Sequence, residues 1–338
     1  MLDTKGNNRT LLCRLCNGKI FAPVYYLDEI EIVRCNHCGL IQFGRYHALV
    51  DLKGHYSYSD MENINVHSRF NQNKIVRASR FRADFFQKYT GLRRGKVLEV
   101  GSSEGHFLHE MKIRGFDVVG IEPSPVGVLK SSEKGITVIN DLVEKANLSD
   151  TYFDAVCMFQ VMEHFENPIE IFHLLHSKII RGGYIMIETP DIYSLGAKFE
   201  KKPHKLFNKE HITCFSPEQL NALLTSVGFM QIIACHYDYD GFRVPYAKSI
   251  KKIFAYITNP KLEGPLQKIL ENKIDIHYRS TPRDEGGTVS IQKERNNKQW
   301  IYLKDIKKTL TAPFDIFFGY IAYRLELGAS YIWVGKKS

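Results

Sequence analysis

The chain has 338 residues, and 46 lysines and arginines against 37 aspartates and glutamates give it a formal net charge of +9. Hydrophobic residues make up 44% and charged residues 25% of the sequence, values that exclude a collagenous, coiled-coil or wholly disordered chain. The length suits two domains, or one large domain with an appendage. No apolar run is long enough to span a bilayer, and the first twelve residues lack the pattern of a signal peptide. We therefore expect a cytoplasmic protein, and the positive excess suggests an anionic partner.

Two Cys-x-x-Cys pairs lie near the N-terminus, Cys13 with Cys16 and Cys35 with Cys38. Turn-forming residues follow each pair, so each can wrap as a knuckle that turns both thiolates toward one ion. Four thiolates at this spacing suit tetrahedral Zn²⁺, and the metal would stabilise a segment too short to bury a core of its own. The sequence thus predicts a zinc ribbon with short strands between the pairs, and it favours this over a redox pair. We expect His37 to be an exposed neighbour and not a ligand. The remaining cysteines are expected to be ordinary buried thiols: Cys157, Cys214 and Cys235.

Helix and strand signals alternate through the middle of the chain. A polar stretch at 55–66 reads as a linker. Strands are expected at Val97–Val100, Val118–Ile121, Thr137–Ile139, Ala155–Phe159, Tyr184–Glu188 and Met230–His236. Helices are expected at Ser68–Tyr89, Gly105–Arg114, Pro125–Lys134 and Asn167–Lys178, and from Ser216 to near Gly228. Apolar strands separated by helices predict a parallel sheet covered on both faces.

The turn after the first of these strands is the most informative stretch of the sequence. Gly101 and Gly105 border a turn that leaves a strand and enters a helix, and glycines there let the backbone approach a ligand at the carboxyl end of a sheet. Glu122 ends the next strand, 21 positions after Gly101, which is the spacing at which a carboxylate meets the ribose hydroxyls of a bound nucleoside. The pattern therefore predicts a nucleoside-binding site.

Successive segments resemble the motifs of class I S-adenosylmethionine-dependent methyltransferases. These segments are Leu98–Gly105, Gly120–Ser124, Phe153–Pro168, Gly182–Pro190 and Glu210–Phe229. The resemblance covers roughly Cys13 to His236 and resumes at Tyr331–Lys337. It points to bacterial enzymes that methylate sugars or surface-polysaccharide precursors, several of which carry an N-terminal four-cysteine zinc ribbon.

The resemblance implies a Rossmann-like α/β fold with a seven-stranded methyltransferase sheet. The implied domains are a zinc ribbon at 1–54, a cofactor-binding core at 55–242, a basic and mainly helical insertion at 243–328, and a last core strand at 329–338. One residue departs from the family pattern, because Ser103 stands where the family usually has the middle glycine of Gly-x-Gly-x-Gly.

The resemblance also assigns seven residues to S-adenosylmethionine: Glu99, Gly101, Ser103, Gly105, Glu122, Asp141 and Gln160. The glycine turn would border the methionine part of the cofactor, Glu99 its amino group, and Gln160 would flank it. Glu122 would hold the ribose and Asp141 the adenine amino group. The structural alternatives are an exposed strand-end acid for Glu122 and a helix N-cap for Asp141.

Two histidines are candidates for the base that takes a proton from the methyl acceptor. A sugar hydroxyl is a poor nucleophile at neutral pH, so a base should accept its proton as the new bond forms, and histidine suits that task. We expect His211 to be the base and His164 to be a supporting polar group. The alternative for each is a histidine that is merely satisfied within the fold.

Most of the charge excess lies in the segment that the resemblance does not explain. Residues 243–311 hold fifteen basic and seven acidic side chains, an excess of eight. We expect this insertion to cap the acceptor site and to attract an anionic saccharide, nucleotide-linked or lipid-linked. The alternative is a solvated charged face. The aromatic run 313–327 could contact a membrane surface or a lipid-linked acceptor, or else form a buried helix or a homodimer contact.

The leading hypothesis is therefore S-adenosylmethionine-dependent O-methylation of a sugar in surface-polysaccharide or glycan biosynthesis. C-methylation of a keto sugar is an alternative within the same group. An rRNA methyltransferase is a second alternative, but Phe159-Gln160-Val161 is not the Asn-Pro-Pro-Tyr used on base amines, and the insertion lacks the spacing of RNA-binding modules. A non-enzymatic zinc-ribbon scaffold with a degenerate fold is the third.

Overall fold

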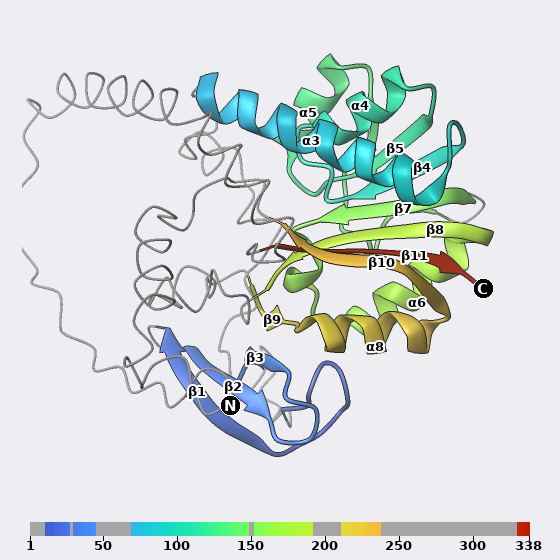
Figure 1. Cartoon of the computed structure of the whole chain (residues 1–338). Helices are drawn as coiled ribbons and strands as arrows, with labels where there is room; N and C mark the ends of the chain where they lie inside the picture. The colour runs from blue at the N-terminus through green and yellow to red at the C-terminus, as the bar shows by residue number, and fades with distance from the viewer. Residues whose placement is uncertain (1–10, 28–29, 45–68, 149–151, 192–210, 238–329) are drawn as a thin grey trace, which may run out of the picture. The chain divides into compact units, whose positions relative to one another are not determined.

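The structure, a computed structural model, describes residues 11–27, 30–44, 69–148, 152–191, 211–237 and 330–338, which all belong to one unit of the chain (Figure 1). The linker at 55–66 and the insertion at 243–328, with its run 313–327, lie outside the described residues. Within the described part of the chain, no helix is long and apolar enough to cross a membrane.

A seven-stranded sheet forms the centre of the fold, as predicted. Its order is β10-β11-β8-β7-β4-β5-β6. The strands are β4 (Lys96–Val100), β5 (Asp117–Ile121), β6 (Thr137–Ile139), β7 (Phe153–Phe159), β8 (Ile179–Pro190), β10 (Phe229–Tyr237) and β11 (Ser330–Lys337). Strand β11 runs antiparallel to both of its neighbours, whereas the other pairs are parallel. The carboxyl ends of β4, β5, β6, β7, β8 and β10 therefore share one edge of the sheet, together with the start of β11.

The helices begin and end within two residues of their predicted limits. They are α3 (Arg69–Thr90), α4 (His106–Ile113), α5 (Pro125–Glu133), α6 (Pro168–Lys178) and α8 (Pro217–Val227), with a 3-10 turn η2 (Met162–His164). Helix α8 shows why: the Ser216 hydroxyl accepts the Gln219 backbone N–H, the Gln219 side chain accepts the Ser216 backbone N–H, and Gly228 ends the helix in a left-handed conformation. The start of β8 was predicted wrongly, because the strand begins at Ile179, where it pairs with Phe153, and not at Tyr184.

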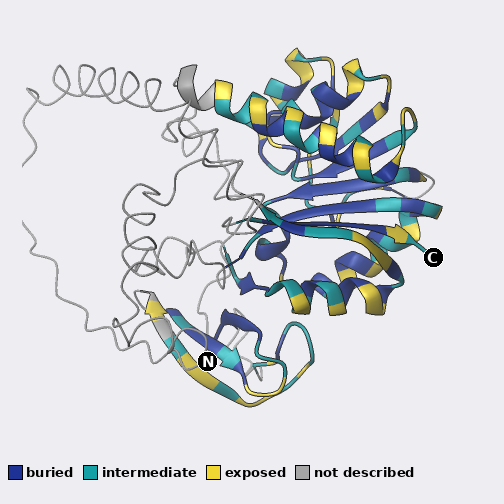
Figure 2. Cartoon of the chain, viewed as in Figure 1, coloured by how far each residue is buried: buried dark blue, intermediate teal, exposed yellow. Residues whose placement is uncertain are grey.

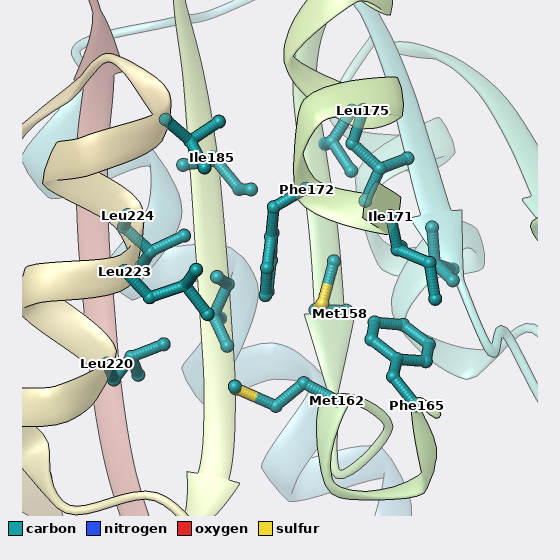
Figure 3. Close-up of a cluster of buried hydrophobic side chains, with 14 of the residues drawn as sticks. Met158, Met162, Phe165, Ile171, Phe172, Leu175, Ile185, Leu220, Leu223 and Leu224 are labelled. Carbon is teal, nitrogen blue, oxygen red and sulfur yellow. The ribbon is translucent and has the colours of Figure 1, made fainter. Parts of the chain in front are cut away.

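Helices cover both faces of the sheet, and alternate strand residues divide between the two layers. On one face, α3 and α4 bury Phe86 and Leu108 against a group of strand residues that includes Val97. On the other face, Phe172 of α6 and Leu224 of α8 pack in a second group (Figure 3). The strands between these layers are largely buried (Figure 2). This packing holds the carboxyl edge of the sheet in place.

The ribbon forms a second, four-stranded sheet in the order β1-β2-β3-β9. Strands β1 (Phe21–Leu27) and β2 (Ile30–Cys35) agree with the expected strands between the cysteine pairs, whereas β3 (Ile41–Phe43) was not predicted. Strand β9 (Thr213–Cys214) was not predicted either, and it comes from the range assigned to the cofactor-binding core. The ribbon sheet and the core thus share a strand.

Candidate functional site

The four N-terminal cysteines gather into one cluster, as the spacing predicted. Their sulfur atoms all lie within 4.8 Å of one another, with Sγ–Sγ distances of 3.4 Å for Cys13–Cys38 and 3.6 Å for Cys16–Cys35. A tetrahedron of thiolates about 2.3 Å from a zinc ion has edges of about 3.8 Å, so the residues fit Zn²⁺. His37 is exposed and outside the cluster.

The knuckle geometry explains how short turns aim the thiols. The residue after each pair, Asn17 or Gly39, has a left-handed backbone, with φ of 57° and 76° respectively. Burial opposes ionisation of the Cys35 thiol, but the backbone N–H groups of Cys38 and His37 lower its pKa to about 7. Amide donors that face a thiolate favour metal binding because the ligand must be deprotonated.

We expect the chain to take up one metal ion with thiolate ligands, and Cys35→Ser to lose it. The substitution removes one of four ligands from a buried cluster, so the remaining three hold the ion more weakly. Substitution with Co²⁺ checks this by the thiolate-to-cobalt charge-transfer absorption. His37→Ala lies in the same knuckle and serves as the matched control. Full absorption in Cys35→Ser, or an equal loss in His37→Ala, would contradict the assignment.

The other three cysteines, Cys157, Cys214 and Cys235, are buried thiols outside any disulfide, as predicted. Burial raises the pKa of the Cys214 thiol, so it stays protonated at neutral pH.

The turn after β4 is left-handed at all three positions of the glycine motif. The φ angles are 70° at Gly101, 48° at Ser103 and 70° at Gly105. A Cβ atom at Gly101 would collide with Val161, and one at Gly105 would lie 2.7 Å from the Ser131 Oγ. A non-glycine residue in this conformation costs roughly 1–2 kcal/mol, which gives a physical reason for glycine at the position that Ser103 occupies. The turn nevertheless keeps its shape.

Glu122 fixes the glycine turn to the end of β5. Its Oε2 accepts the Ser103 backbone N–H at 2.7 Å, and its Oε1 accepts the Ser124 backbone N–H at 2.9 Å. The residue is 7% exposed, so the alternative of an exposed strand-end acid is wrong. Burial raises the pKa of the carboxyl group, and the two backbone donors partly oppose that rise. Each oxygen keeps a lone pair for a further donor, as a ribose hydroxyl would be.

Asp141 follows β6 at the same edge. Its Oδ1 accepts the backbone N–H of Leu142 at 2.9 Å, and a turn follows it rather than a helix, so the N-cap alternative is not realised. Its neighbour Asn140, which was not singled out, donates to the backbone oxygens of Glu122 and Pro123 at 2.9 and 3.0 Å. Asn140 thus ties β6 to the turn that carries Glu122.

Gln160 lies directly after β7 with a left-handed φ of 59°. Its Nε2 donates to the Glu188 Oε1 at 2.9 Å, and Arg82 of α3 binds both oxygens of the same carboxylate at 2.8 and 2.7 Å. The Arg82 guanidinium also lies over the Phe159 ring, 4.4 Å from its centroid. Arg82 and Glu188 were not predicted as site residues, because their charges look like any others on an amphipathic helix and at a strand end.

Glu99 is buried in β4, and its Oε2 has no hydrogen-bond partner among the described residues. Burial raises its pKa well above the usual range, and Arg82 only partly opposes this effect. A buried carboxyl oxygen without a donor is costly unless a ligand supplies one. An ammonium group at this position would do so, which fits the expectation for the amino group of a bound methionine moiety.

His164 and His211 come from distant parts of the chain and lie side by side. His164 is in η2, His211 lies two residues before β9, and their ring centroids are 5.0 Å apart at 87°. The Glu163 carboxylate is the third member, since one ligand atom from each of the three lies within 4.8 Å of the others. The Glu163 Oε2 accepts the Thr189 hydroxyl at 3.2 Å, whereas its Oε1 has no partner among the described residues. Glu163 was missed by the sequence reasoning, although it is adjacent to a predicted residue.

A second polar pair lies at the same edge. His236 at the end of β10 and Asp191 just after β8 have Nε2 and Oδ2 2.8 Å apart. The His236 ring also lies 5.1 Å from the ring of Tyr331, centroid to centroid. Nothing in the periodicity of β10 set this histidine apart from its neighbours.

We expect the free energy of unfolding to fall as pH rises from about 4 to about 8, in part because of Glu163. Burial raises its pKa to about 8 in the folded chain, so in this range the folded state holds a proton that the unfolded state has lost. Glu163→Gln should flatten this part of the pH profile, measured by urea denaturation. Glu166→Gln changes an exposed carboxylate in the same turn and should keep the wild-type profile. Equal slopes in wild type and Glu163→Gln would contradict this assignment.

Residues 69–232 match the family model of the methyltransferase domain. This part of the chain has a Rossmann-like methyltransferase fold. Its sheet order and glycine turn are those of the class I S-adenosylmethionine-dependent fold, which confirms the predicted fold.

Curated relatives match a shorter stretch of the chain. The chain is similar to the ubiquinone biosynthesis O-methyltransferases of Chromobacterium violaceum, 28% identical over 115 residues, and Pectobacterium atrosepticum, 30% identical over 110 residues. These matches cover 32% and 30% of this chain, and the chain spans about half the length of these relatives, 50% and 46%. A solved S-adenosylmethionine-dependent methyltransferase from Archaeoglobus fulgidus is 19% identical, with a TM-score of 0.45, over 78% of this chain and 94% of that one.

Proposed function

We propose that this protein transfers a methyl group from S-adenosylmethionine to a hydroxyl oxygen of a nucleotide-linked or lipid-linked sugar, in the biosynthesis of a surface polysaccharide or another glycan. The observation that supports it most is that two polar groups lie at the same edge of the sheet. The glycine turn with Glu122 offers a nucleoside site, and the paired rings of His164 and His211 offer proton acceptors.

In this proposal the residues at the cofactor end bind different parts of S-adenosylmethionine. Glu122 holds the ribose hydroxyls, Asp141 the adenine amino group, and Glu99 the amino group of the methionine moiety. The left-handed turn at Gly101, Ser103 and Gly105 borders the methionine part of the cofactor. Bound there, S-adenosylmethionine supplies a methyl group on a sulfonium, which needs an in-line approach of the nucleophile and little else from the protein.

The acceptor end supplies the base. His211 takes the proton of the acceptor hydroxyl as the carbon–oxygen bond forms. His164, whose ring centroid lies 5.0 Å from that of His211, is the supporting polar group. The buried Glu163 beside them does not take that proton, since burial raises its pKa to about 8 and its carboxyl group is therefore already protonated at neutral pH.

The charge of the insertion is the basis for the class of substrate that we propose. The excess of eight basic residues in 243–311 suits a pyrophosphate-linked acceptor, and the run 313–327 suits a lipid-linked one at a membrane surface of the cytoplasm. Both parts rest on the sequence alone, because these residues lie outside the described part of the chain.

The test measures cofactor binding and turnover separately. Calorimetric titration with S-adenosylmethionine should give saturable binding, and its absence in the zinc-loaded protein would refute the enzyme proposal and favour a scaffold. Incubation with nucleotide-linked and lipid-linked sugars should then give a product heavier by one methylene unit. The position of the label from a ¹³C-methyl cofactor, on oxygen or carbon, distinguishes O-methylation from C-methylation. Methylation of ribosomal RNA but of no sugar would establish the alternative substrate.

A further pair of variants tests the base. His211→Ala should lower turnover about 10²–10⁴-fold, the range typical of a lost general base, while the affinity for S-adenosylmethionine stays within twofold of wild type. His173→Ala changes an exposed histidine on α6 and should leave both unchanged. Unchanged turnover in His211→Ala would show that another group takes the proton.

A further inference from the structure

The zinc ribbon is joined by backbone pairing to the segment that carries His211. Strand β3 pairs with β9 in register, Ile41 opposite Cys214 and Gln42 opposite Thr213. The backbone N–H of Phe43 donates to the oxygen of Ile212 at 3.0 Å, so the ribbon binds the backbone of the residue that follows His211. Among the described strands, β3 is the only partner of the two-residue strand β9. A strand this short has little stability of its own, and the ribbon supplies its inter-strand hydrogen bonds.

The cysteine cluster in turn fixes β3. The second knuckle ends at Cys38, three positions before Ile41, and the backbone N–H of Cys35 donates to the oxygen of Leu40 at 2.9 Å. On the other side, the Gln219 Nε2 donates to the backbone oxygen of Cys38 at 2.8 Å. Because Gln219 also caps the start of α8, the second knuckle holds the chain on both sides of β9.

Apolar contacts reinforce the same junction. Cys214 of β9 is buried in a cluster with four residues of the ribbon, and Ile212 packs against it. These ribbon residues are Ile30, Ile32, Ile41 and Phe43. Phe43 is 1% exposed, so its ring lies wholly inside the junction.

Strand β9 also reaches the acceptor end of the site. The Thr213 hydroxyl donates to the backbone oxygen of Glu163 at 3.4 Å, and the His211 ring lies against His164. The bonds that shape the cofactor turn are different ones, since Glu122 binds the backbone of Ser103 and Ser124. One set of contacts therefore joins the ribbon to His211, and another set builds the cofactor site.

We propose that the zinc ribbon is a positioning element of the acceptor site: through β3 and β9 it holds His211 against His164. The inference rests on the proposed function in so far as His211 contacts the acceptor. In this role the four-cysteine site determines the position of His211, in addition to stabilising the N-terminal segment. Phe43, which acts through the backbone of Ile212, is a positioning residue.

The test observes His211 directly. The ring C–H resonance of His211, assigned in ¹³C-histidine-labelled full-length protein by its loss in His211→Ala, is followed by NMR as a chelator removes the metal. We expect it to shift on metal removal, together with that of His164, and to return when zinc is restored. Calorimetry on the same samples should show a change of less than twofold in the affinity for S-adenosylmethionine. An unmoved His211 resonance, or a parallel loss of cofactor affinity, would overturn the proposal.

A substitution with the metal in place provides the second arm. Phe43→Ala should shift the His211 resonance and lower turnover on the order of 10²-fold, the cost of a misplacement of about 1 Å, while Phe43→Leu should recover most of both. The cobalt absorption confirms that the ribbon of each variant is loaded. Tyr26→Ala, an exposed site on β1, is the matched control and should match wild type. If no acceptor is methylated, the proposed function fails but the resonance still decides this inference, and Phe43→Ala with an unshifted His211 would refute it.

Discussion

Glu122→Ala is expected to weaken S-adenosylmethionine binding about 100-fold or more. The carboxylate accepts two backbone N–H groups, from Ser103 and Ser124, and hydrogen bonds to a charged group contribute about 1.5–3 kcal/mol each. Their loss leaves two donors unpaired in a buried turn and frees the left-handed Ser103. The ribose loses its acceptor at the same time. Calorimetric titration of wild type and variant measures the effect.

Two controls separate binding from a general loss of structure. Glu133→Ala removes a carboxylate at the exposed end of α5 and should bind the cofactor as wild type does. Glu122→Gln keeps the shape and one acceptor oxygen, so it should fall between wild type and alanine. If Glu122→Ala is folded, as judged by circular dichroism, and binds the cofactor normally, the ribose lies elsewhere.

The elements that could be predicted from the sequence are those with a local signal. The knuckles follow from cysteine spacing, the start of helix α8 from its N-cap serine, proline and first-turn acid, and the cofactor edge from glycines and a strand-end acid. Each of these is encoded within a few neighbouring residues. The family resemblance assigned Glu122 and Asp141 to the cofactor, and the parallel sheet brings the strand ends that carry them to one edge.

What could not be predicted depends on contacts between distant parts of the chain. Strands β3 and β9 have three and two residues, too few for any periodicity to show. The pairing of Asp191 with His236 joins residues 45 positions apart, and that of Arg82 with Glu188 joins residues 106 positions apart. Such pairs have no signature in one sequence, because either member alone looks like an ordinary surface charge.

The pair of Arg82 and Glu188 carries the second large effect that we expect. Arg82→Ala should lower the free energy of unfolding by about 3–5 kcal/mol, the usual cost of breaking a buried ion pair from one side. Glu188 has a fully buried side chain and would lose the cation that binds both of its oxygens, whereas the Arg82 side chain is 13% exposed. Urea denaturation measures the change.

Arg80 offers a matched control two positions away on the same helix. Its side chain is 62% exposed and binds Glu110 at 3.0 Å, so Arg80→Ala should cost less than about 1 kcal/mol, as exposed ion pairs do. Equal losses in the two variants would mean that the Arg82 pair is not the buried support that its geometry indicates.

The double variant Arg82→Met with Glu188→Met distinguishes stability from function. Replacement of both partners by apolar side chains of similar length removes the unpaired charge, so most of the lost stability should return. Affinity for S-adenosylmethionine should not return with it. Gln160 would lose the carboxylate that holds its amide, and Glu99 would lose the cation that lowers its pKa. A double variant with recovered stability and wild-type affinity would show that the pair supports the fold alone. Recovered stability with weak binding would show that the pair also supports the methionine end of the site.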